Sequence, residues 1–115
     1  HPRFKDNTLI EEDVIRVIVQ KWEMILFTNK GELLGDPNFG GNLNYYLHQT
    51  QVSASYVKQQ LVDQISSYIP EIANIGYKLN VVFLEDPNDF KQLMVINFEI
   101  ADYKVYAEIG NRYGK

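Results

Sequence analysis

The sequence of 115 residues contains no cysteine and only two histidines, His1 and His48. Without thiols there is no disulfide framework, no zinc–thiolate site and no cysteine nucleophile. Neither histidine has a second ligand at metal-site spacing, which argues against a zinc or iron centre. We therefore expect no metal and no cofactor.

The sequence also lacks a strong charge of either sign and a long apolar run. Its formal net charge is −4 and is spread evenly, whereas a nucleic-acid-binding protein shows a basic face. No apolar run approaches the ~20 residues that span a bilayer, and the first residues, HPRFKD, lack a signal-peptide core. We expect a soluble protein that binds neither nucleic acid nor a membrane. The start at His1 rather than Met indicates trimming or excision from a longer product.

The chain contains enough apolar residues to form one hydrophobic core. Hydrophobic residues make up 45% of the sequence and aromatic residues 13%, which in a chain of this length predicts one domain over residues 1–115. Residues 110–115 read as a polar tail. The stretch TNKGELLGDPNFG, from Thr28 to Gly40, is rich in turn formers, and its glycines can take positive φ. We expect Pro37 to stiffen this corner and Phe39 to anchor it in the core.

A first helix is predicted before this corner. Its apolar residues recur at the i+3 and i+4 spacing of a buried helix face, and polar residues fill the opposite side. Thr8 and Glu11 have the spacing of a capping box, so we expect the helix to begin there. The apolar row contains Val14, Ile15, Ile18, Val19, Trp22, Ile25 and Leu26.

A second long helix is predicted from about Ser53 to Ile69. Val57, Leu61, Ile65 and Tyr68 form its apolar row, with Lys58, Gln59, Gln60, Asp63 and Gln64 on its polar flanks. Ser53 or Ser55 is suited to the N-cap, and Pro70 ends the helix.

Three segments near the C-terminus alternate apolar and polar residues, which is typical of half-buried strands. They are residues 75–83, 94–100 and 103–109. The reverse-turn sequence EDPND at 85–89 should join the first two in a hairpin, and it lacks the ligand series of a calcium loop. The third segment is expected at a sheet edge. The fold class is therefore α+β, with two long helices and a short one, near Leu43 to Leu47, on a three-stranded antiparallel sheet.

The segment ILFTNKGELLGDPNFGGNLNYYL carries a resemblance to a known family. With the helix that follows it, this pattern resembles the small baseplate-wedge protein of contractile phage tails, whose relative in type VI secretion is TssE. The likeness runs from about Trp22 to Ile100. The positions that carry it are Thr28, Gly31, Glu32, Pro37, Phe39, Gly40, Leu43 and Leu47, together with Pro70 farther along.

The resemblance implies a structural protein rather than an enzyme. A member of this family joins the baseplate to the first sheath ring of a contractile tail and initiates sheath assembly. Its partners are the tail sheath protein and the other baseplate wedge subunits, so it belongs to a large multi-protein assembly. Its location would be the tail baseplate of the virion, reached after assembly in the host cytoplasm. The equivalent subunit of a type VI secretion or other contractile injection system is the alternative.

The resemblance also indicates partner-binding residues. Family members carry a Glu-Pro-Arg motif after the second long helix, where this chain reads Ile-Pro-Glu, so Pro70 is kept and Glu71 replaces the arginine. In the family the sheet accepts strands from the sheath arms. The hypothetical acceptor here is the third strand, with Val105, Tyr106, Ala107 and Ile109; of these, Tyr106 is expected to contact another chain.

A peptidoglycan hydrolase is the less favoured alternative, because family members are sometimes labelled lysozyme-like. Glycosidases need two carboxyl groups about 5 to 10 Å apart. Glu32 with Asp36, or Glu71 with Glu85, could supply them. The turn-rich surroundings of Glu32 and Asp36 favour a role in turn geometry over catalysis.

Overall fold

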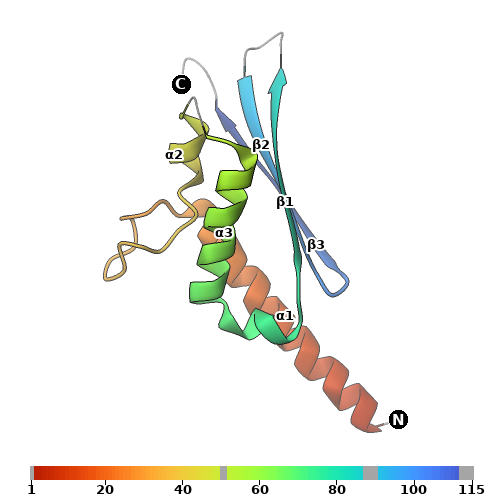
Figure 1. The fold of residues 1–115 in the computed structure, drawn as a ribbon. Helices are drawn as coiled ribbons and strands as arrows, with labels where there is room; N and C mark the ends of the chain where they lie inside the picture. The colour runs from red at the N-terminus through yellow and green to blue at the C-terminus, as the bar shows by residue number, and fades with distance from the viewer. Residues whose placement is uncertain (1, 50–51, 87–90, 112–115) are drawn as a thin grey trace.

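The computed structural model of the chain describes residues 2–49, 52–86 and 91–111. Helices α1 (Pro2–Phe27), α2 (Leu43–Leu47) and α3 (Ala54–Tyr68) are followed by a short 3₁₀ helix, η1 (Pro70–Asn74). The strands β1 (Lys78–Asp86), β2 (Lys91–Ile100) and β3 (Tyr103–Asn111) complete the chain. Figure 1 shows the helices gathered beside the long, twisted strands. The predicted α+β fold is confirmed.

The three strands form one antiparallel sheet in the order β1-β2-β3. The register aligns Val81 of β1 with Ile96 of β2, and Ile96 with Ala107 of β3. Because side chains alternate along a strand, these three residues share one face, and all three are buried. The predicted hairpin and third strand are present, but β1 begins at Lys78 rather than at residue 75 and β2 at Lys91 rather than at Met94. Strand β1 continues through Glu85 and Asp86, which were predicted to be in the turn, and residues 87–90 of that turn lie outside the described residues.

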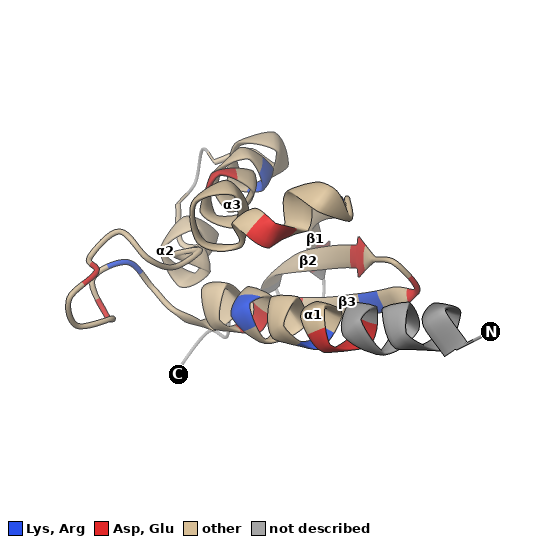
Figure 2. Ribbon diagram, turned by 90° about the horizontal axis from the view of Figure 1, so that it is seen from below, with Lys and Arg blue, Asp and Glu red and all other residues tan. Residues whose placement is uncertain are grey.

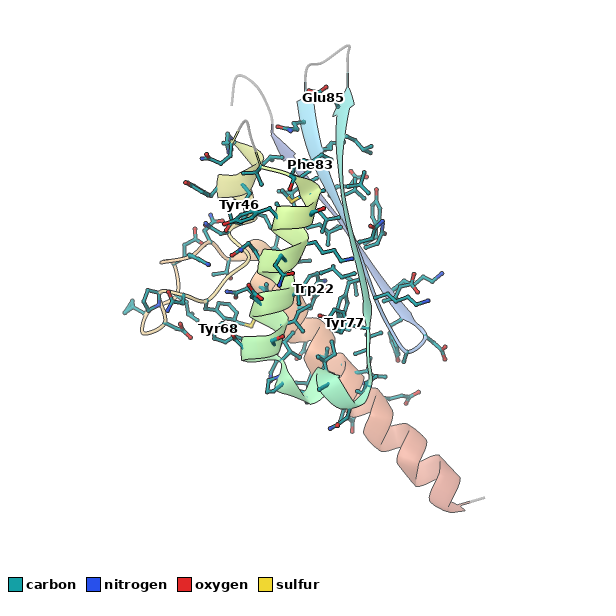
Figure 3. All side chains as sticks on the ribbon, in the orientation of Figure 1. Trp22, Tyr46, Tyr68, Tyr77, Phe83 and Glu85 are labelled. Carbon is teal, nitrogen blue, oxygen red and sulfur yellow. The ribbon has the colours of Figure 1, made fainter. Side chains whose placement is uncertain are left out.

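Helices α1 and α3 bury the apolar face of the sheet. Trp22 of α1 is fully buried and stacks on Phe98 of β2, with ring centroids 4.6 Å apart (Figure 3). Val57, Leu61 and Ile65 of α3 are buried in the same core. Both apolar rows predicted from helical spacing therefore face the sheet, with Val14, Val19 and Tyr68 at their half-buried margins.

The predicted start of α1 is wrong. The helix begins at Pro2, so Thr8 lies within it rather than at an N-cap. Proline suits the first helical position, because its φ is preset and its missing N–H would have had no helical partner. No glycine or second proline follows before Thr8 to interrupt the helix.

The limits of the other elements follow local chemistry. Of the two candidate caps for α3, Ser53 is used, and its Oγ accepts a 3.1 Å hydrogen bond from the backbone N–H of Tyr56. Pro70 ends α3 and begins η1. Strand β3 continues to Asn111, so the predicted polar tail begins later than residue 110. The end of β3 remains in the sheet despite its polar sequence, because Gly110 pairs with Leu93 of β2.

Candidate functional site

The corner between α1 and α2 folds as a series of tight turns. Gly31 and Gly35 have φ of 91° and 88°, in the left-handed region that glycine enters at little cost. Gly31 N–H donates to the carbonyl of Pro37 at 3.0 Å and closes the loop on itself. The carboxylate of Glu32 accepts from the backbone N–H of Asn29 at 2.9 Å and from its Nδ2 at 3.2 Å. Glu32 therefore holds the turn.

The far end of the corner lies directly against α1. Gly41 N–H donates to the carbonyl of Ile25 at 2.7 Å, and Asn42 N–H donates to that of Thr28 at 3.3 Å. At Gly40, whose φ is 123°, a Cβ would lie 2.5 Å from the Thr28 carbonyl oxygen. Only glycine allows this close backbone approach. Leu43 and Leu47 follow on α2 and are buried in the core.

A buried glutamine connects the corner to α3. The Oε1 of Gln64 accepts from Gly40 N–H at 2.8 Å, and its Nε2 donates to the carbonyl of Asn38 at 2.9 Å. The prediction that Gln64 lies on the polar flank of α3 is wrong, because the residue is only 7% exposed. The sequence did contain a signal of this burial: Gln64 is three residues after Leu61, which places it on the same side of the helix as the apolar row. Gln64 thus provides the hydrogen-bond partner of the buried Gly40 N–H and of the Asn38 carbonyl.

Phe39 anchors the corner as predicted. It is buried, and its ring meets that of Tyr68 edge to face, with centroids 4.9 Å apart. The Tyr68 hydroxyl donates to Asp36 Oδ1 at 3.0 Å, and Asn38 N–H donates to the same oxygen at 3.3 Å. Burial, together with the hydrogen bond to Asp36, raises the pKa of Tyr68. Asp36, like Glu32, is thus engaged in fixing the turn.

Glu71 forms an ion pair within the chain. Lys21 Nζ of α1 donates to Glu71 Oε2 of η1 at 2.7 Å. This hydrogen bond lowers the pKa of Glu71, and a backbone hydrogen bond adds to the effect. Pro70 beside it is exposed. Glu71, at the position where the resemblance implies an arginine, therefore contacts α1.

Glu71 and Glu85 lie at opposite ends of β1. Glu71 precedes the strand on η1, whereas Glu85 is near its far end (Figure 3). At about 3.3 Å per residue, the strand separates them by roughly 20 Å or more. That separation exceeds the range in which two carboxyl groups act together on one glycosidic bond.

Strand β3 is at one edge of the sheet, where its outer side has no strand partner among the described residues. Val105 is half-buried, and Ala107 and Ile109 face the core. Tyr106 lies on the opposite face, 59% exposed, and its hydroxyl donates to Glu108 Oε2 at 2.6 Å. That hydrogen bond, more than burial, raises the pKa of Tyr106. A partner at this edge would thus meet backbone groups and Tyr106.

Charges do not gather into a single patch on the part of the chain that Figure 2 colours by charge. Acidic and basic positions are interspersed along α1 and the corner. Within residues 2–49, 52–86 and 91–111, there is no group of three or more His, Asp or Glu side chains that could hold a metal ion. None of the helices in those ranges is long and apolar enough to cross a bilayer.

Comparison with known proteins adds no family: a scan of the chain against protein-family models found no match, and a search of curated proteins found no relative. The function is therefore inferred from the sequence pattern and from the surfaces that the fold exposes.

Proposed function

We propose that this protein is a structural baseplate wedge subunit of a contractile tail, which joins the baseplate to the first sheath ring and initiates sheath assembly. The observation that carries the proposal is the outer edge of β3, a strand of nine residues with no strand partner among the described residues. An unpaired edge offers a row of N–H and C=O groups to an extended segment of another chain. The sheath protein would add such a segment as a fourth strand.

A second exposed surface supports the proposed contact with other wedge subunits. Helix α1 buries one row against the sheet, yet Val17, Met24 and Phe27 remain 45%, 53% and 68% exposed. Their i+7 and i+3 spacing places them along one side of the helix, opposite the buried row. We call Val17, Met24 and Phe27 the outer row of α1. Apolar residues so arranged are suited to packing against a helix of a partner.

The corner connects α1, which carries the outer row, to α3 and through it to the sheet with the β3 edge. It contacts α1 through Gly41 and α3 through Gln64, and α3 packs on the sheet that carries the β3 edge. In the proposed function the corner holds the wedge-binding helix and the sheath-binding sheet in a fixed orientation. Such a role would explain why the corner from Thr28 to Gly40 is made of turn residues that hydrogen bonds hold in place.

Proline substitution in β3 tests the strand-addition step. N–H groups alternate along an edge strand between the paired side and the free edge, so one of Val105→Pro and Tyr106→Pro removes an edge-facing donor while leaving the β2–β3 ladder intact. We expect that variant to fold, to bind the wedge subunits and to fail to start sheath assembly. The readout is sheath length on isolated baseplates by electron microscopy.

Asn80→Pro and Val81→Pro in β1 form the matched control at the opposite edge of the sheet. Sheath assembly at the parental level on every folded proline variant of β3 would exclude this edge as the acceptor. Loss of assembly only with the β1 variants would assign the sheath contact to β1 instead.

The equivalent subunit of a type VI secretion system would use the same surfaces in a different machine. Co-purification with sheath and wedge proteins from each class of machine separates the two: stable capture by phage-tail components alone supports a virion subunit. Capture by secretion-system components alone would support the alternative.

A further inference from the structure

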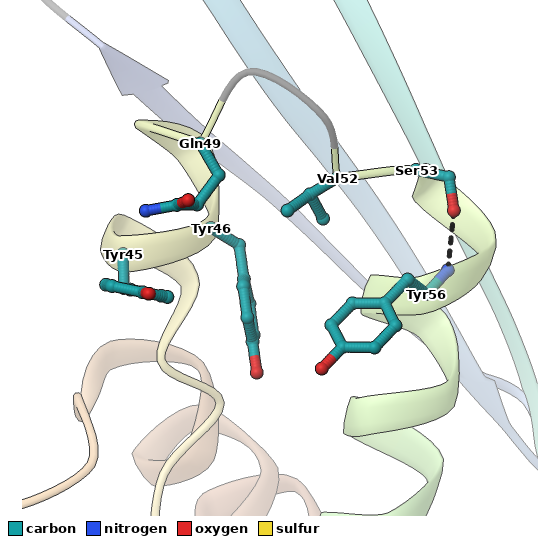
Figure 4. A pocket seen from close by; sticks show the side chains of 6 residues that line it. All are labelled: Tyr45, Tyr46, Gln49, Val52, Ser53 and Tyr56. Carbon is teal, nitrogen blue, oxygen red and sulfur yellow. Dashed lines mark hydrogen bonds between the residues drawn. The ribbon is translucent and has the colours of Figure 1, made fainter.

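A pocket of about 420 Å³ lies between α2 and the start of α3. Figure 4 shows the ring of Tyr46 between those of Tyr45 and Tyr56. A cavity of this size is in the range of sites that take a small molecule or a few residues of a peptide. It is lined by Tyr45, Tyr46, Gln49, Val52, Ser53 and Tyr56.

Three tyrosine rings form most of the wall. Tyr46 is the inner one, only 7% exposed, and it meets Tyr45 and Tyr56 edge to face with centroids 5.6 Å and 5.7 Å away. Tyr45 and Tyr56 are 56% and 49% exposed. These edge-to-face contacts hold the rings at steep angles to one another, and ring surface remains open to a ligand.

The polar groups of this lining are neutral. They are the three phenol hydroxyls, the Gln49 amide and the hydroxyl of Ser53, whose oxygen accepts the N–H of Tyr56. Burial, with a smaller effect of the Tyr56 phenol, raises the pKa of Tyr46, so this hydroxyl stays protonated near neutral pH. The wall therefore combines aromatic surface with hydrogen-bond donors and contains no ionised side chain among the lining residues.

We propose that this pocket binds a proline-containing, extended segment of a partner protein. Such a segment matches the lining of the pocket both in charge and in shape. An anionic ligand would find no cationic partner among the lining residues, whereas a polyproline II segment is neutral and preformed. Its rings pack on aromatic side chains, and its carbonyls, which have no internal hydrogen bonds, accept from hydroxyl and amide donors.

None of the residues that line the pocket is on β3, although α2 itself lies close to that strand. Because the two proposals rest on different residues, substitutions in one set test one proposal without changing the residues of the other. Within the pocket, the exposed Tyr45 and Tyr56 can be changed with little effect on the core, whereas Tyr46 is itself a core residue.

The test is a titration of the intact chain with a capped proline decamer, followed by NMR of the Gln49 side-chain amide and the Val52 methyl groups. We expect both signals to shift and to saturate. Tyr45→Ala and Tyr56→Ala should each weaken binding tenfold or more, while Tyr103→Ala, at an exposed tyrosine of β3, should bind the decamer like the parent. Circular dichroism verifies that each variant is folded, and Tyr56→Leu replaces Tyr56→Ala if the latter does not fold.

Two outcomes would overturn the proposal. One is the absence of shifts at Gln49 and Val52, or equal affinity of the parent and both folded tyrosine variants. The other is saturable binding of tetramethylammonium, added as a second probe, that excludes the decamer, since the pocket would then be an aromatic site for cations.

Discussion

Phe39 is the side chain on which the corner depends most. Its ring is 8% exposed and packs against Tyr68, while the backbone around it turns sharply. Phe39→Ala removes the buried ring and leaves a cavity, so we expect the free energy of unfolding to fall by about 3 kcal/mol or more. Urea unfolding measures this loss.

Phe27 offers a matched control for that substitution. It is also a phenylalanine, but it is 68% exposed at the end of α1. Phe27→Ala should change the free energy of unfolding by no more than about 0.5 kcal/mol. Equal losses for the two variants would show that Phe39 is not an anchor.

The ion pair between Lys21 and Glu71 should make stability depend on pH. The pKa of Glu71 is lowered from its ordinary value of 4.5, mainly by the hydrogen bond from Lys21. The folded state thus holds this proton less tightly than the unfolded state, so the pair stabilises the fold above about pH 4.5 and loses its effect as the pH falls through the lowered pKa. Because both side chains are partly exposed, the contribution is about 0.5 kcal/mol.

Unfolding of the parent and of Glu71→Gln across the acid range measures this effect. The difference in the free energy of unfolding should be largest near neutral pH and should shrink in acid. Lys21→Met should remove the pH-dependent part of the difference. A difference that is the same at every pH would contradict the assignment of the effect to this pair.

At the scale of the element, α1 has two apolar sides, one buried and one exposed. One side packs on the sheet through Trp22, and the outer row faces away from it. Met24→Glu places a charge in the outer row. We expect stability to change by no more than about 0.5 kcal/mol, because Met24 is exposed. Affinity for the other wedge subunits should fall at least tenfold, which corresponds to about 1.4 kcal/mol.

Calorimetric titration with purified wedge subunits provides that measurement. Glu23→Gln, next to Met24 but outside the outer row, is the control and should bind like the parent. If Met24→Glu binds the wedge subunits with parental affinity, the outer row is not their binding surface.

The helices also show where sequence patterns were sufficient and where they were not. Helical spacing correctly predicted the buried rows of α1 and α3, because one side of each helix is covered by the rest of the core. The same reasoning misplaced Gln64, which is polar by type but lies on the apolar side of α3. Its burial depends on two backbone groups of a corner that is distant in sequence.

At the scale of the whole molecule, the helices and the sheet should unfold together. Trp22 is the single tryptophan, it is fully buried, and it lies between α1 and the sheet. Its fluorescence therefore reports helix-to-sheet packing, while far-ultraviolet circular dichroism reports the elements themselves. We expect the two signals to give the same midpoint in urea, as in a two-state transition. Separate midpoints would show that the helices and the sheet are not one cooperative unit.

The sequence by itself determined the class of fold, the three strands, the buried rows and the turn-rich corner. These features depend on local periodicity, on proline and glycine, and on side-chain polarity, which act over a few residues. It also contains the residues on which the proposed family resemblance rests, among them Phe39 and Gly40.

Only the tertiary structure decided how those pieces meet. It paired Glu71 with Lys21, placed Gln64 beneath the corner, and brought Tyr46 and Tyr56 to one pocket. It also left the outer side of β3 without a strand partner among the described residues. The Glu71–Lys21 pair and the hydrogen bonds of Gln64 join residues 24 to 50 positions apart, so no local pattern encodes them. They form only when α1, α3 and the corner pack together.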